Sequence, residues 1–172
     1  MTITLYRNQI LYDIANICYI EAKCAEYGAA TQPHITGSHL INSEIINDAC
    51  QDGNIDHISR IIGDMHAHAE ELLFPLSRRN IASDLLDNLL TEPDTYVTHL
   101  HSQSPLSHTT LILLSRLLHQ YIVYRTVAEW LSISHPSASA KWQEKSAIIA
   151  SEIRSSVTSA CAGAFKRRTS PL

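Results

Sequence analysis

The stretch IDHISRIIGDMHAHAEELLFPL, from Ile55 to Leu76, carries the most regular hydrophobic spacing in the chain. Its apolar residues recur at steps of three and four, which is the period of one face of an α-helix. The members of this seam are Ile55, Ile58, Ile62, Met65, Ala69, Leu72 and Leu76. Pro75 lacks a backbone N–H, so we expect the helix to bend or end near Phe74. At its start, Gly53 is expected to take the positive φ of a C-cap and Asn54 to cap this helix.

Five further segments show helical spacing, and with the seam they predict an all-α, single-domain bundle of about five to six helices. Few glycines interrupt the chain, which argues against a many-turned β architecture. The segments are Arg7 to about Glu26, Leu40 to Ala49, Ile81 to Leu90, Ser107 to about Ile133, and about Ala140 to Ala162. The stretch TYVTHLHSQSP (95–105) alternates weakly and is left open as extended chain or a small β element. We expect the helical domain to cover residues 1–165 and a flexible basic tail to cover 166–172.

The segment from Ser107 to Ile133 is apolar almost all round. A helix without a polar face lies at the centre of its own domain or is covered by another subunit. With about 27 residues it would be ~40 Å long, which is considerable for a domain of this size. We therefore expect a long apolar helix at the centre of the bundle.

Charge and composition limit the partners and the cellular location that can be expected for the protein. The formal net charge of −4 gives no global attraction to nucleic acid, so we expect no specific nucleic-acid partner. Polar residues interrupt the apolar runs at the N-terminus and in 107–133, which predicts neither a signal peptide nor a membrane span. The four cysteines are scattered without a CxxC pair, as is typical of a reduced intracellular protein. The sequence predicts cytoplasmic synthesis and no membrane partner.

Histidines suggest metal binding, but their spacing offers little support for it. His66 and His68 diverge by roughly 200° on a helix, so one ion cannot bind both. Each has an acidic neighbour on its own face, Glu70 for His66 and Glu71 for His68. No HExxH pattern is present. Sites built from separate helices stay open, and the alternative function is therefore a small metal-binding bundle that uses histidines such as His66, His108 and His119.

Catalytic motifs are not apparent in the sequence. It contains no GxSxG, no P-loop and no dinucleotide-binding glycine pattern. We therefore expect no enzyme activity, no catalytic residue and no cofactor.

Two stretches carry a resemblance to a known group of proteins. They are DGNIDHISRIIGDMHAHAEELLFPLSRR (52–79) and TTLILLSRLLHQYIVYRTVAEWLSISHPSASAKWQEKSAIIASEI (109–153), followed by a basic C-terminus. In the order of these parts the chain resembles the small α-helical head-completion or head–tail adaptor (connector) proteins of tailed phages and prophages. The resemblance covers roughly residues 52–172.

The resemblance implies a non-enzymatic structural subunit of the virion. Its partners would be further copies of itself in a ring, together with portal and tail or neck proteins. A ring needs two different contact patches on each subunit, which the surplus of apolar helix surface would provide. Lys166, Arg167 and Arg168 would form a docking arm that orders on a neighbouring ring. The alternative for this tail is a solvated end without a partner.

Overall fold

The computed structural model describes residues 1–30, 49, 53–77, 93–101 and 106–162. Within them the protein is mostly helical, with four helices and one two-stranded sheet. The elements in chain order are β1 (Thr2–Tyr6), α1 (Arg7–Ala30), α3 (Ile55–Leu72), β2 (Thr95–His99), α4 (His108–Ser134) and α5 (Pro136–Ala162). The predicted helices at 40–49 and 81–90 lie outside the described residues, apart from Ala49, which is fully buried.

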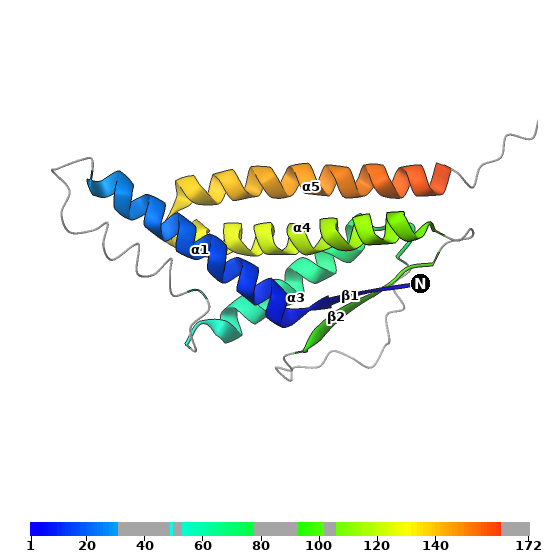
Figure 1. Cartoon of the computed structure of the whole chain (residues 1–172), viewed down its shortest axis with the longest axis horizontal. Helices are drawn as coiled ribbons and strands as arrows, with labels where there is room; N and C mark the ends of the chain where they lie inside the picture. Colours follow the sequence, from blue (N-terminus) through cyan, green and yellow to red (C-terminus); the bar gives the residue numbers. More distant parts are fainter. Residues whose placement is uncertain (31–48, 50–52, 78–92, 102–105, 163–172) are drawn as a thin grey trace, which may run out of the picture.

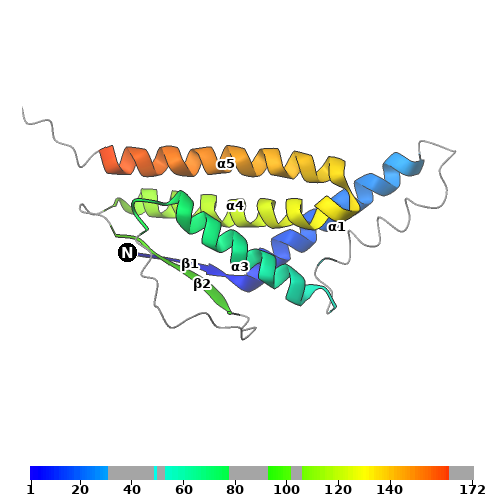
Figure 2. The same ribbon diagram turned by 180° about the vertical axis from the view of Figure 1, so that it is seen from behind.

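The helix α4 contacts α1, α3, α5 and β1. Figure 1 shows α5 running alongside α4, to which it is joined through His135, so the two helices form an antiparallel hairpin. In Figure 1 α1 crosses in front of α4, and in the reverse view of Figure 2 α3 crosses in front. The two helices therefore cover opposite sides of α4. The C-terminal end of α1 extends beyond the α4–α5 corner in both views.

The seam predicted for α3 is confirmed over most of its length. Its inward residues Ile58, Ile62 and Ala69 are no more than 1% exposed. The helix ends at Leu72, and Leu73 rather than half-buried Leu72 is the leucine that enters the core. The predicted end near Phe74 is thus correct to within two residues.

The turn before α3 differs from the prediction. No glycine in the described part has a positive φ, so the C-cap conformation expected at Gly53 is wrong. Asn54 does occupy the N-cap position of α3, but its side chain makes no capping hydrogen bond. Its backbone lies in the α region, with φ −112° and ψ −12°. A capping side chain reaches the first-turn N–H groups from the β region, which explains why this one does not cap.

The prediction of a mostly helical fold is confirmed, and the structure adds a small antiparallel sheet that β1 and β2 form. In β1 Ile3 and Leu5 are buried between exposed neighbours, which is the period of two of a strand with one face on the core. The weakly alternating stretch from Thr95 does form a strand, and its Tyr96 and Thr98 are buried. The register pairs Ile3 with Thr98 and Leu5 with Tyr96. The strands are remote in sequence, and their pairing depends on tertiary packing that local periodicity does not contain.

Two helices, α1 and α5, extend beyond their predicted bounds. The helix α1 continues past Gly28 to Ala30. The helix α5 begins at Pro136 rather than near Ala140, because proline is well suited to the first helical position. The helix α4 begins as predicted, with the Ser107 hydroxyl accepting a hydrogen bond from the Thr110 N–H at 3.1 Å.

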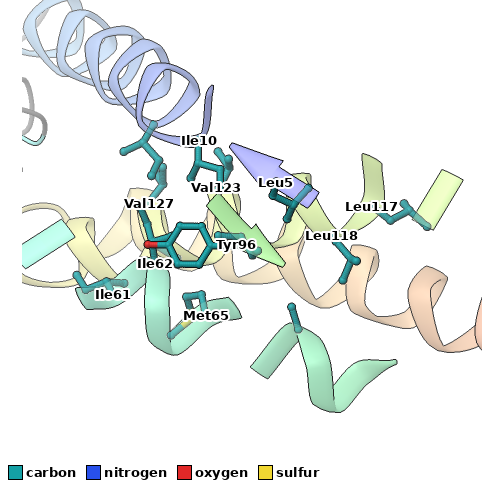
Figure 3. Packing of buried hydrophobic residues seen from close by; sticks show 14 of the residues in the cluster. Leu5, Ile10, Ile61, Ile62, Met65, Tyr96, Leu117, Leu118, Val123 and Val127 are labelled. Carbon is teal, nitrogen blue, oxygen red and sulfur yellow. The ribbon is translucent and has the colours of Figure 1, made fainter. Parts of the chain in front are cut away.

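Side chains from both ends of the chain meet in one hydrophobic core. Figure 3 shows Leu5 of β1, Tyr96 of β2, Ile62 of α3 and Val123 of α4 within it.

None of the described helices combines the length and the hydrophobicity needed to cross a bilayer.

We predict that Ile62→Ala lowers the free energy of unfolding by about 2–5 kcal/mol, because it removes a fully buried side chain from the contact between α3 and α4. Ile133, which is 86% exposed on α4, provides the matched control, and Ile133→Ala should change stability little. Urea denaturation followed by circular dichroism measures both. Equal midpoints for the two variants would contradict the packing described for α3.

Candidate functional site

A cleft of about 490 Å³ lies between β1, α1 and α4. This volume falls in the range typical of ligand-binding clefts. Its apolar lining includes Leu5, Ile17 and Val123. The polar lining residues are Thr4, Tyr6, Gln9, Asp13, Asn16, Ser115, Arg116, His119, Gln120 and Tyr124. The cleft therefore combines an apolar surface with many hydrogen-bonding groups.

The closest polar contact in this cleft joins α1 to α4. The His119 Nε2 lies 2.7 Å from the Asp13 Oδ2, and the two side chains are 21% and 47% exposed. Sequence reasoning singled out His119 but not Asp13, which lies 106 positions earlier. Asp13 is also the only described side chain hydrogen-bonded to His119. The pair thus lacks the bonded Ser or Cys nucleophile of an acyl-transfer triad.

The structure does not bring together the three histidines of the metal hypothesis. His66 lies on α3, where its Nε2 is 3.0 Å from the Thr98 hydroxyl of β2 and its ring packs on Tyr96 with centroids 5.3 Å apart. His119 pairs with Asp13 on another face of the bundle, and His108 is exposed at the start of α4. Across the described ranges no three His, Cys, Asp or Glu side chains gather in a group that could hold a metal ion.

The other histidine of α3 behaves as a surface residue. The His68 Nδ1 lies 3.5 Å from a Glu71 carboxylate oxygen, the pairing at i,i+3 that the sequence suggested. Both side chains are more than half exposed, at 61% and 70%, so the pair contributes little to stability. The contact described for His66 is the one with Thr98, and its pairing with Glu70 stays a prediction.

A buried carboxylate that sequence reasoning missed connects α1 with α5. The Glu21 side chain is 10% exposed, and its Oε1 accepts hydrogen bonds from the Lys141 Nζ at 2.7 Å and the Trp142 Nε1 at 3.1 Å. The Lys145 Nζ lies 4.0 Å from the centre of the Trp142 ring. Because Glu21 accepts from Lys141 and Trp142 at the same oxygen, the cluster holds α1 against α5.

The outer side of α1 carries large exposed residues. Tyr12, Tyr19, Ile20 and Tyr27 are 68%, 52%, 57% and 74% exposed. At 100° per residue these four side chains fall within an arc of about 100°, so they share one face, called here the tyrosine face. Isolated exposed apolar residues are ordinary, but a contiguous group is typical of a contact surface.

The predicted interaction residues Lys166, Arg167 and Arg168 lie outside the described residues.

Comparison with known proteins gives no relative for this arrangement. No protein-family model, no curated protein and no solved structure matches the chain. Function therefore has to be inferred from the cleft, the tyrosine face and the sequence.

We predict opposite outcomes for the two neighbouring histidines of α3. His66→Ala should lower the free energy of unfolding by about 1–3 kcal/mol, because Thr98, which is 2% exposed, loses its hydrogen-bond partner. His68→Ala should change it by no more than about 0.5 kcal/mol. Thermal melting with and without zinc measures both effects.

The same experiment tests the metal hypothesis. A zinc-dependent rise in the melting temperature of the wild type that disappears in His66→Ala and His119→Ala would support a metal site. Equal melting temperatures for His66→Ala and His68→Ala would contradict the role given to the Thr98 contact.

Proposed function

We propose that this protein is a non-enzymatic assembly subunit of a phage or prophage virion, a head–tail adaptor or head-completion protein. It acts through protein–protein contacts with neighbouring copies and with portal and tail or neck proteins. It is made in the cytoplasm and ends in the virion. We further propose that residues 40–49 and 81–90 form helices, as the sequence predicts. Together with the four described helices they would give the bundle its expected five to six helices.

The tyrosine face is the observation that carries the proposal. It is an exposed apolar and aromatic surface on α1, and α1 extends beyond the α4–α5 corner (Figure 1), where a neighbouring subunit can reach it. Tyrosine is enriched at protein interfaces because its large ring buries area while its hydroxyl stays hydrogen-bonded. Lys23 adds a cation beside this surface, with its Nζ 5.8 Å from the centre of the Tyr19 ring.

Further exposed apolar residues offer the second patch that a ring requires. Ile112 and Leu113, near the start of α4, are 49% and 47% exposed. They lie at the end of α4 remote from the α4–α5 corner, whereas the exposed Tyr27 lies near the end of α1 that projects beyond this corner. A head-to-tail interface joins two different surfaces of the same chain, and these two patches are suitably separated for that role.

The basic tail supplies the third contact in this proposal. Lys166, Arg167 and Arg168 follow α5, which ends at Ala162. Three cations within three residues would attract acidic groups on a neighbouring ring, and the attraction would weaken as salt is added.

We predict that the wild-type protein forms multimers and that the triple variant Tyr12→Ser, Tyr19→Ser, Tyr27→Ser is monomeric, because the substitutions remove most of the apolar area of the tyrosine face. Size-exclusion chromatography with light scattering measures the mass. The double variant Phe74→Ser, Ile133→Ser is the matched control, since it removes residues that are 72% and 86% exposed elsewhere, and it should still form multimers. Circular dichroism verifies that all variants keep their helices. A wild-type protein that stays monomeric up to high concentration would contradict self-association through this face.

A further inference from the structure

The strand β1 is bonded to β2 along one edge, and no other strand of the described residues pairs with its second edge. Met1 and Leu100 exchange two backbone hydrogen bonds, with N–O distances of 3.0 and 2.7 Å. Bonded pairs alternate with non-bonded pairs in an antiparallel ladder, so the N–H and C=O groups of Thr2 and Thr4 point away from β2. No described residue hydrogen-bonds to these groups. They form a free template for another strand.

The sequence of β1 contains none of the usual protection of an open edge. Natural proteins discourage pairing at sheet edges with charged residues, prolines or bulges. The strand reads TITLY, with no charge and no proline, and its five residues pair with β2 in continuous register. Its consecutive β-branched residues Thr2, Ile3 and Thr4 favour the extended conformation of a strand.

The cleft described above borders the C-terminal part of β1. Thr4, Leu5 and Tyr6 of β1 line it together with Arg116 and Gln120 of α4. A helix with its side chains is about 10–12 Å across, whereas neighbouring strands lie about 4.8 Å apart. A cleft of about 490 Å³ between a strand and a helix therefore suits a single extended chain better than a folded element.

Arg116 is the charged side chain of this cleft for which the described residues provide no partner. Asp13 already pairs with His119 at 2.7 Å. Arg116 is exposed, and no carboxylate of the described residues lies within ion-pair distance of it. A guanidinium recognises a carboxylate through paired hydrogen bonds, so the complementary occupant carries an acidic side chain.

We infer that this cleft binds an extended acidic segment of a partner protein, which adds to β1 as a third strand and places an Asp or Glu side chain against Arg116. Backbone hydrogen bonds to Thr2 and Thr4 supply affinity, and Arg116 supplies the preference for acid. This site does not depend on the tyrosine face or on the proposed role in the virion.

Selection from a yeast-displayed library of random ten-residue peptides on the purified full chain tests the inference. In the enriched peptides, residues that favour β-strands should occupy alternate positions on either side of an Asp or Glu. Thr4→Pro removes one outward N–H without removing a bond to β2, and it should weaken binding of the synthesised peptides at least tenfold. Val97→Pro is the matched control, because Val97 pairs with Thr4 and has its N–H on the opposite edge of the sheet, so binding should persist.

Arg116→Glu provides a second test, which remains available if the Thr4→Pro variant does not fold. Selection on this variant should enrich peptides with Lys or Arg at the position where peptides selected on the wild type carry Asp or Glu. Failure to enrich peptides, equal binding to Thr4→Pro and wild type, or an unchanged preference in Arg116→Glu would each overturn the inference. Enrichment only on a chain that lacks residues 163–172 would also overturn it, because the protein's own tail would then be the occupant.

Discussion

The rest of the structure depends on burying the apolar surface of α4. Leu114, Leu118, Ile122 and Leu131 of this helix are each no more than 1% exposed, because α1, α3, α5 and β1 all pack against it. No single neighbour could cover such a helix, since a partner helix hides only one stripe of its surface. The covering elements come from both ends of the chain, so the burial of α4 brings the N-terminal strand and helix next to the C-terminal hairpin. The cleft and the tyrosine face both follow from this arrangement, because the cleft lies where β1 and α1 meet α4, and the side of α1 that is turned away from the core stays exposed.

Polar contacts then fix how the covering elements are placed. Glu21 of α1 binds Lys141 and Trp142 of α5, and the Arg7 guanidinium of α1 donates to the Ser59 hydroxyl of α3 at 2.8 Å. Hydrophobic burial is not directional and would tolerate several crossing angles. A largely buried carboxylate without its donors would be costly, so the Glu21 contacts favour one placement of α1 over its alternatives.

Local periodicity was sufficient to predict the helices of the described residues, and it was insufficient to predict the contacts between them. The seam of α3 and the apolar run of α4 are patterns within one segment, and both helices were predicted close to their observed bounds. The strand β1 was missed because five residues that lead directly into a helix contain only two inward positions, Ile3 and Leu5. The partners of His66 and His119 lie 32 and 106 positions away, beyond any local pattern. Glu21 was within reach of sequence reasoning, because it stands between Cys18 and Ala22 on the inward side of α1, where a charged residue indicates a buried partner.

The central claim is that α1 presents an interface rather than a solvated face. Photo-crosslinking from a benzoylphenylalanine placed at Tyr19 tests it most directly, with the same group at exposed Ile133 as the reference position. The account predicts that irradiation of the assembled protein links Tyr19, but not Ile133, to another copy of the chain or to a neighbouring virion protein. No crosslinks from Tyr19, or equal crosslinking from both positions, would contradict it.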